Sequence, residues 1–388
     1  MIYPVTTNGT FLLLAVSSLA LGLAAGAVMH RSDYCLAGMF RDLFLFRRVD
    51  KLRTLLLLIV VTMVLFEVAR LAGLLPNYPF PLYYAPSAAN LVGGLLFGVG
   101  MVLAGGCVVG TLYRMGAGST LSALAFIGLI VGSAGYAEIF PFWSAFIKRT
   151  TFLPGRVTLP QMLGIGPTVP VLLAAVAGGA LLLRWQRAGK FVRKADIAGF
   201  LPPWQAALLL ALISLLSVIV VGLPLGVTTG FAKMGGWVER LVAPGHVAQS
   251  AFFQTVPLHY RHPITGADLA GGPAPLFDAL AAIQFPLVIG IVLGSAASAL
   301  LLGEWHIHRA APGRQLASAF TGGVIMGLAS RMAPTCNVWH LMGGLPILAG
   351  SSLLFLAGLL PGAWVGSRLL TGVVIPPERN GDERLNRP

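Results

Sequence analysis

Apolar residues in this chain come in long runs that recur from one end to the other. Each run is close to the length of about 20 residues that a helix needs to cross a bilayer. The runs predict transmembrane helices near residues 10–29, 54–75, 89–106, 119–138, 168–184, 204–222, 280–302, 316–332 and 345–370. No basic residue precedes the first run and no small-residue cleavage site follows it, which favours a span over a signal peptide. The pattern predicts an all-α integral membrane protein with about nine transmembrane helices plus re-entrant or short helices.

Composition agrees with a lipid environment. Hydrophobic residues make up 56% of the chain and charged residues only 10%, and the mean hydropathy is +0.83. The 48 glycines and 26 prolines would be unfavourable in a soluble helical protein. Membrane helices tolerate both residues, and interrupted helices use them to line polar cavities.

The formal charge of +13 is distributed in a way that argues against a nucleic-acid partner. Basic residues gather in segments between spans and in the tail, a pattern that the positive-inside rule assigns to the cytoplasm. These residues are Arg47, Arg48, Lys51, Arg53, Arg184, Arg187, Lys190, Arg193, Lys194, Arg309, Arg314, Arg379, Arg384 and Arg387. The uncharged loop 76–86 suits the outer face. Nine spans with the N-terminus outside and the C-terminus cytoplasmic satisfy every cluster and place 139–168 and 227–279 outside.

A glycine spacing is repeated ahead of the only three cysteines. Glycines and a small residue stand at shared offsets before Cys107 (Gly93, Gly94, Gly98, Ala104), before Cys336 (Gly322, Gly323, Gly327, Ala333) and before Cys35 (Gly22, Gly26, Ser32). A weaker fourth copy ends at Gly235. Such self-similarity indicates repeated structural units, here close-packed helices that deliver thiols to shared places.

The predicted topology turns this repeat into an inverted one. We expect residues 1–388 to form a single membrane transport domain, with 1–194 as the first inverted repeat and 200–370 as the second, including the long external loop 227–279. Inverted repeats are characteristic of transporters, with the substrate path at the repeat interface. Fourteen helical residues cover about 21 Å, less than the bilayer core of about 30 Å. We therefore favour half-helices that enter from each face and place the thiols near the middle.

Several interpretations of the thiols compete. A free cysteine is often a small buried hydrophobe, but three at equivalent positions argue for a function. A disulfide would leave one thiol over. Thiolates also bind soft metals, yet the chain has no Cys-x-x-Cys, and only His340 lies within four residues of a thiol.

Arginines surround the thiols in the sequence. Arg31 and Arg331 precede Cys35 and Cys336, and Arg41 and Arg114 follow Cys35 and Cys107. Charged groups within spans usually face a polar pathway, although those at helix ends can snorkel to the surface. Helix starts after Cys107 and Cys336 would attract anions. Together these features describe a site for a soft, sulfur-bearing anion. Glu67 and Arg70, three residues apart, read as a local ion pair.

Motifs around the thiols resemble the YeeE/YedE family. They are Ser32-Asp33-Tyr34-Cys35 with Phe40-Arg41-Asp42, Gly93-Gly94-Leu95-Leu96-Phe97-Gly98 with Leu103-Ala104-Gly105-Gly106-Cys107, and Gly322-Gly323 with Ala333-Pro334-Thr335-Cys336-Asn337 and Gly343-Gly344-Leu345-Pro346. The resemblance covers roughly residues 10–115 and 315–370. Pro334-Thr335 departs from the smaller residues that relatives often carry there.

The resemblance implies uptake of thiosulfate across the bacterial inner membrane, with Cys35, Cys107 and Cys336 contacting its sulfur in turn. We place Arg31, Arg114, Arg331, Gly105, Gly106 and Asn337 beside them as substrate-binding candidates. Weak S–H donors at several stations would bind modestly and release readily, as conduction requires. The resemblance also implies a TusA-type cytoplasmic sulfur carrier as a possible partner. We expect no cofactor, no metal and no catalytic residue, and no phosphate-binding loop suggests ATP coupling.

Alternatives stay open at this point. The substrate could be a selenium compound or another sulfur species. A membrane-embedded thiol or persulfide relay enzyme would need a thiolate activated by nearby positive charge, which the arginines permit. A purely structural subunit would tolerate alanine at all three cysteines.

Overall fold

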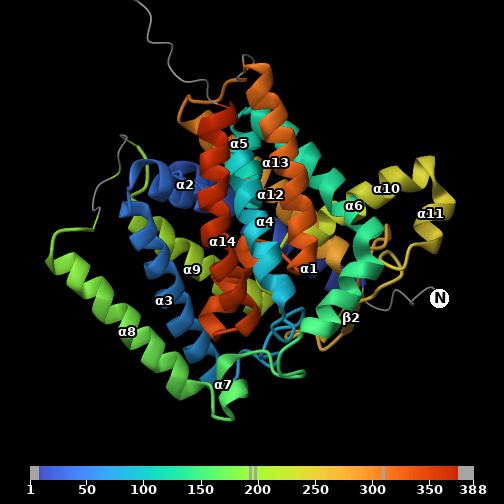
Figure 1. Cartoon of the computed structure of the whole chain (residues 1–388). Coiled ribbons are helices and arrows are strands. Elements are labelled where there is room, and N and C mark those ends of the chain that lie inside the picture. The colour runs from blue at the N-terminus through green and yellow to red at the C-terminus, as the bar shows by residue number, and fades with distance from the viewer. Residues whose placement is uncertain (1–7, 192–194, 196–198, 308–310, 375–388) are drawn as a thin grey trace, which may run out of the picture.

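The computed structural model describes residues 8–374 apart from 192–194, 196–198 and 308–310. Nearly all of the regular structure in this part is helical (Figure 1). The helices are α1 (Asn8–Ser32), α2 (Leu36–Phe46), α3 (Asp50–Leu71), α4 (Ala88–Leu103), α5 (Val108–Gly116), α6 (Thr120–Thr150), α7 (Leu159–Leu163), α8 (Thr168–Arg187), α9 (Pro203–Val220), α10 (Thr228–Val242), α11 (Pro244–Gln249), α12 (Ala279–Leu301), α13 (Gly313–Met332) and α14 (Gly350–Leu369), with short η1 (Trp339–Gly344), η2 (Leu345–Ile347) and η3 (Leu370–Val374). Arg193, Lys194, Arg309, Arg379, Arg384 and Arg387 lie outside the described residues.

Eight helical segments of the described chain are long and apolar enough to cross a membrane. They are Gly9–Phe46, Asp50–Leu71, Ala88–Gly116, Thr120–Thr150, Thr168–Arg187, Pro203–Val220, Ala279–Leu301 and Gly350–Gly372. Eight of the nine predicted spans match them. The ninth, 316–332, is the helix α13, which carries Arg314, Gln315, Ser330 and Arg331 near its ends and is not among the eight. The prediction of an all-α multi-pass membrane protein is confirmed.

Glycines let the central helices approach closely. The antiparallel helices α4 and α13 cross so tightly that a Cβ at Gly100 would lie 2.7 Å from the backbone nitrogen of Met326. Added Cβ atoms at Gly132 on α6 and Gly358 on α14 would overlap carbonyl oxygens of α13 and α4. Small residues at helix interfaces allow this packing, because apolar burial drives little association between helices in lipid.

Helices are interrupted at each thiol. Cys35 is the N-cap of α2 and Cys107 is the N-cap of α5, and Cys336 directly precedes the helical turn that leads into η1. A left-handed residue comes just before each thiol: Asp33 (φ 44°), Gly105 (φ 74°) and Thr335 (φ 90°). These residues end the preceding helix and let the chain change direction. The weaker fourth copy behaves differently, since Gly235 lies inside α10.

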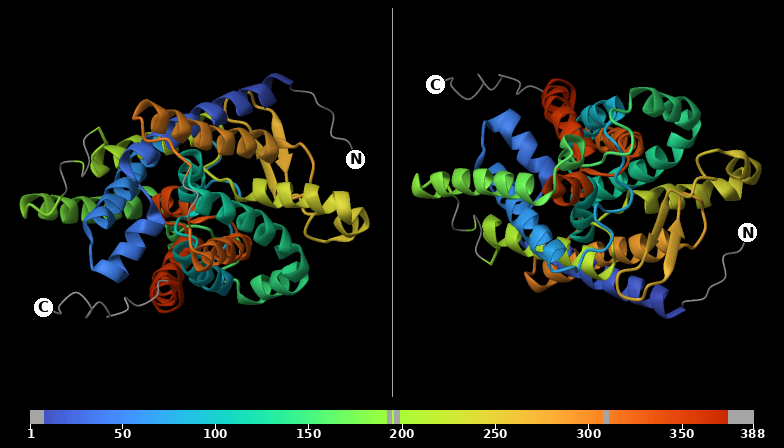
Figure 2. Two further views of the ribbon diagram at one scale, coloured as in Figure 1. Left: turned by 90° about the horizontal axis from the view of Figure 1, so that it is seen from above. Right: turned by 90° about the horizontal axis from the view of Figure 1, so that it is seen from below.

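The periphery carries two projections on opposite sides of the bundle (Figure 2). The helix α8 packs mainly on α3, and α10 with α11 extends on the other side. Segment 227–279 contains these two helices and a pair of antiparallel strands, β1 (Leu258–Arg261) and β2 (Asp268–Gly271). The sequence patterns did not predict the strand pair. Inside α10, the Lys233 side chain is fully buried and donates to the Asp278 carboxylate at 2.8 Å. This contact fastens α10 to the start of α12.

Candidate functional site

The three thiols converge from separate helix breaks. All three are buried and free. The thiols of Cys35 and Cys107 both lie beside Gly110, where an added Cβ would lie 2.9 Å and 3.3 Å from their sulfurs, and the Cys107 sulfur accepts from the Gly110 N–H at 3.3 Å. From the C-terminal half, the amide of Asn337 lies beside the Cys107 thiol. Asn337 directly follows Cys336, so the two halves of the chain meet at their thiols.

Asn337 is an unusual residue for a membrane interior. Its side chain is fully buried, and neither its amide nitrogen nor its oxygen has a well-formed hydrogen bond. The nearby Trp339 Nε1 and Thr335 Oγ1 are likewise buried without a partner. Unsatisfied buried polar groups are costly and call for an explanation. Donors held ready for a polar substrate provide one.

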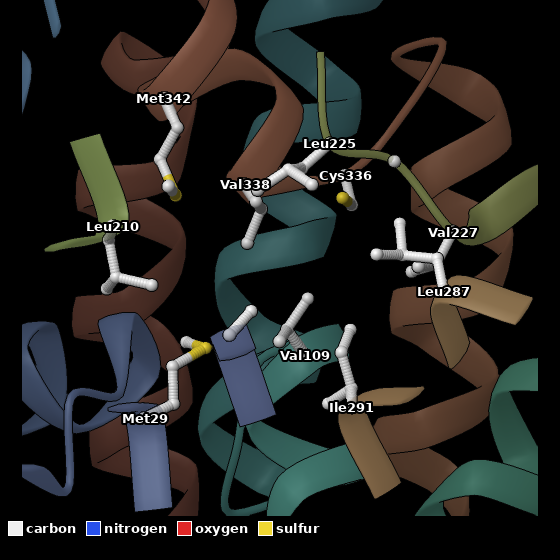
Figure 3. Close-up of a pocket in the computed structure, with 12 residues that line it drawn as sticks. Met29, Val109, Leu210, Leu225, Val227, Leu287, Ile291, Cys336, Val338 and Met342 are labelled. Atoms are coloured by element: carbon white, nitrogen blue, oxygen red, sulfur yellow. The ribbon is translucent and has the colours of Figure 1, made fainter. Parts of the chain in front are cut away.

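A small apolar cavity adjoins Cys336 (Figure 3). Its volume is about 20 Å³, enough for about one water molecule. It is lined by Ala25, Met29, Val109, Leu210, Leu225, Gly226, Val227, Leu287, Ile291, Cys336, Val338 and Met342. Val227, the N-cap of α10, comes from the helix break that follows α9. Cys336 therefore lines a small cavity whose other walls are apolar.

A larger cavity, here called the Arg331 cavity, lies where α4 begins and α13 ends. Its volume is about 250 Å³, and its lining includes Tyr84, Asn90, Tyr136, Thr229 and Arg331. The Arg331 guanidinium donates to the hydroxyl of Thr229 at 3.0 Å and to that of Thr228. Its Nε is buried without a partner. The cavity thus presents a cation held by neutral hydroxyls.

A second large cavity, the Arg114 cavity, lies at the opposite end of the α4/α13 pair. Its volume is about 280 Å³, and its lining includes Arg41, Gly105, Arg114, Ser122 and Ser318. Arg114 donates to the carbonyl of Gly105 and pairs with Asp33 at 3.2 Å. Arg41 pairs with Asp42 at 3.0 Å. Both arginines of this cavity therefore have carboxylate partners.

The substrate-binding candidates predicted from the sequence divide into those around the thiols, those that line the two large cavities, and Arg31. Cys35, Cys107, Cys336 and Asn337 come together at the centre, while Arg331 and Arg114 with Gly105 line cavities at the two ends. Gly106 packs against Gly110 and Thr111 next to the thiols. Arg31 lines none of the three cavities just described. Its carbonyl accepts from the N–H of Leu201 at 2.7 Å, and its Nε is buried without a partner.

Sequence reasoning missed several residues that support the site. Thr228 and Thr229, which hold Arg331, follow the break at Val227, and only the weak fourth glycine copy hints at them. His340 is the only histidine within four residues of a thiol in the sequence. Its ring contacts Ser352 Oγ and the Ala333 carbonyl, each at 2.9 Å, and stacks on Phe355. It therefore braces the segment that carries Cys336.

One group of side chains in the described part of the chain could hold a metal ion: Glu138, Glu239 and His246. It lies on α6, α10 and α11 and includes none of the thiols. The predicted Glu67–Arg70 pair is present at 2.7 Å.

Helices that break at buried thiols, between polar cavities at opposite ends of a membrane-spanning bundle, define a membrane transport protein. The comparison of sequences specifies the family. The profile of the sulphur transport family matches residues 31–365, and the chain belongs to this family.

Individual relatives agree with this assignment. The chain is 27% identical over 368 residues to the thiosulfate transporter TsuA of Spirochaeta thermophila, covering 90% of this chain and 98% of that protein. It is 27% identical over 378 residues to the thiosulfate transporter TsuA of Escherichia coli, covering 94% and 96%. A probable transporter YedE of Salmonella typhimurium is 28% identical over 178 residues, covering 45% of this chain and 42% of that protein.

Proposed function

We propose that this protein carries thiosulfate across the bacterial inner membrane along a path that passes Cys336, Cys107 and Cys35. The observation that carries the proposal is the meeting of these thiols with the unpartnered Asn337 amide, between two arginine-lined cavities. Two relatives aligned over nearly their whole length are named thiosulfate transporters.

The chemistry of the centre suits this anion. Thiosulfate carries one sulfur in place of a sulfate oxygen. Thiol S–H groups are weak hydrogen-bond donors, so breaking their contact with this sulfur costs little free energy when the anion moves on. Several weak stations in sequence allow conduction, whereas one strong site would trap the ion. Asn337 supplies N–H donors for the oxygens.

The orientation of the protein in the membrane follows from the charge distribution. Arg41, Lys51 and Arg53 lie toward the Arg114 cavity, and the positive-inside rule places this end in the cytoplasm. The Arg331 cavity then opens outside, with the N-terminus outside and the C-terminus cytoplasmic. The sulfur delivered at the Arg114 end would be available to a TusA-type carrier protein.

Helix pairing supports an inverted repeat of 1–194 and 200–370. In this repeat α4 corresponds to α13 and α6 to α14, and the contact of α4 with α14 is matched by the contact of α13 with α6. Likewise α1 corresponds to α9 and α3 to α12, and the contact of α1 with α12 is matched by the contact of α9 with α3. In this proposal Cys107 and Cys336 are equivalent positions, and Val227, not Gly235, is the equivalent of Cys35. The path then lies at the repeat interface.

Uptake of doubly labelled thiosulfate into proteoliposomes tests the function. We expect wild type to accumulate the intact anion, and Cys35→Ala, Cys107→Ala, Cys336→Ala and Asn337→Ala to lose uptake. Ser144→Ala, which changes an exposed hydroxyl of α6 outside both cavities, is the matched control and should retain it.

Other outcomes point elsewhere. Separation of the two sulfur labels would indicate a thiol or persulfide relay, which the contact between Cys35 and Cys107 could also serve. Uptake of selenium compounds in preference to thiosulfate would reassign the substrate. Full activity of all three cysteine variants would overturn the thiol-lined path.

A further inference from the structure

The two large cavities differ in how their arginines are neutralised. In the Arg331 cavity the guanidinium contacts two threonine hydroxyls, and its charged or titratable surroundings are Cys336, Tyr84 and Tyr136. No carboxylate of the described residues forms an ion pair with Arg331. An anion that enters this cavity meets a cation whose charge is uncompensated.

The Arg114 cavity is arranged in the opposite way. The Asp33 carboxylate accepts from Arg114 at 3.2 Å, from the hydroxyl of Tyr113 at 3.0 Å and from Lys51 at 3.1 Å. Its side chain is 51% exposed, and it reaches the cavity through its pairing with the lining residue Arg114. A carboxylate therefore already occupies the position that an anion would take on Arg114.

Asp33 is also linked to the nearest thiol through the backbone. Its carbonyl accepts the N–H of Cys35 at 2.9 Å, and its left-handed φ of 44° forms the break between α1 and α2. The corresponding position before Cys107 is a glycine, Gly105. A glycine would satisfy the backbone at position 33 with less strain, so the carboxylate is the feature that an aspartate adds.

We propose that Asp33 is a tethered counter-anion that competes with the transported anion for Arg114 and keeps binding at this end weak. A tethered group competes at a high effective concentration. The anion then binds at Arg331, passes the thiols, and is displaced from Arg114 by Asp33. This proposal rests on the proposed function and adds a residue that favours release at one end.

The test measures transport in both directions with oriented proteoliposomes. In Asp33→Asn the concentration of thiosulfate that half-saturates entry from the Arg114 end should fall by roughly fivefold, the size of a partly exposed ion pair. Half-saturation from the Arg331 end should stay unchanged, and the maximal uptake rate should fall because release is slower. Asp33→Glu should restore wild-type values.

The matched control is Asp50→Asn, which removes a carboxylate paired with Arg53 outside the Arg114 cavity. It should leave both half-saturating concentrations unchanged. A second variant keeps Asp33 in place: Lys51→Met leaves the carboxylate to Arg114 and the Tyr113 hydroxyl and should weaken entry from that end. This variant tests the proposal even if Asp33→Asn does not fold.

The results separate the two proposals. Wild type that fails to move thiosulfate overturns the proposed function. Wild type that moves it, with Asp33→Asn unchanged from the Arg114 end or altered equally from both ends, overturns the role of Asp33 alone.

Discussion

The thiols of Cys35 and Cys107 both lie against Gly110, a position that leaves no room for a side chain. A Cβ at Gly110 would lie 2.9 Å from the sulfur of Cys35 and 3.3 Å from that of Cys107. Both distances are shorter than carbon–sulfur contact allows without displacement. Glycine at this position on α5 is therefore a condition for the contact between two separate helix breaks.

The first prediction concerns this glycine. Gly110→Ala should displace the thiols at a cost of about 1–3 kcal/mol, which corresponds to a roughly five- to 150-fold lower uptake if the thiol pair lies on the path. Gly38→Ala on α2 is the control, because its Cβ would lie at an ordinary 3.6 Å from the Cys35 Cβ. Normal thiosulfate uptake by Gly110→Ala would remove the thiol pair from the path.

A second prediction compares two glycines of α6. A Cβ at Gly132 would overlap the carbonyl oxygen of Val324 on α13, whereas nothing lies within 4 Å of a Cβ at Gly135. Gly132→Ala should lower the free energy of unfolding by about 1–3 kcal/mol through overpacking. Gly135→Ala should be neutral or stabilising by up to about 1 kcal/mol, owing to helix propensity. Reversible unfolding in mixed detergent micelles measures both, and equal effects would contradict the close packing.

A third prediction concerns the backbone ahead of Cys336. Thr335 has a φ of 90°, which is strained for a β-branched residue. Thr335→Gly should raise the free energy of unfolding by about 1 kcal/mol, since such strain costs on the order of 1–3 kcal/mol. Thr335→Ala keeps a Cβ and should gain less, so the difference between the two variants isolates the backbone contribution. A melting temperature lower for glycine than for alanine would refute it.

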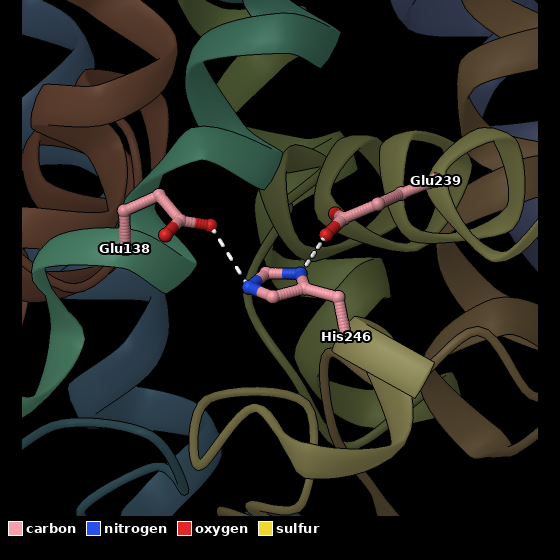
Figure 4. Close-up of side chains that lie close together, drawn as sticks. All are labelled: Glu138, Glu239 and His246. Atoms are coloured by element: carbon pink, nitrogen blue, oxygen red, sulfur yellow. Dashed lines mark hydrogen bonds and ion pairs between the residues drawn. The ribbon is translucent and has the colours of Figure 1, made fainter. Parts of the chain in front are cut away.

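A fourth prediction is a pH dependence outside the membrane-spanning segments. The His246 ring lies between Glu239 and Glu138 (Figure 4), and the hydrogen bond to Glu239 followed by the charge of Glu138 raises its pKa above 6.5. A raised folded-state pKa gives stabilisation that is complete below the unfolded value and is lost as pH rises through the folded one.

The attachment of α11 to α6 should therefore weaken as pH rises from about 6.5 through the raised pKa of His246. Hydrogen exchange of the α10–α11 amides, corrected for the intrinsic effect of pH, should speed up over this range. His246→Gln should abolish the change, and substitution of the exposed His259 by Gln should preserve it. Exchange in wild type that does not vary after correction would count against the pairing.

Helix positions could be predicted because lipid demands long apolar segments with satisfied backbones. Each of the nine predicted segments is helical in the structure. The glycine spacing before the cysteines also located the helix breaks at Cys35, Cys107 and Cys336. The same spacing does not mark a helix break at Gly235, which lies inside the continuous helix α10 and packs against Ala134 and Ile130. Glycine spacing alone does not distinguish a helix end from close packing between continuous helices.

By itself, the sequence determined the class of protein, the spans and the helix breaks at the three cysteines, since these depend on local composition and spacing. Only the tertiary structure decided which residues meet. The pairing of Asp33 with Arg114, the hydroxyls on Arg331 and the placing of Asn337 beside Cys107 depend on contacts between segments far apart in the chain. No local pattern encodes such contacts, because they arise from how the helices pack against one another.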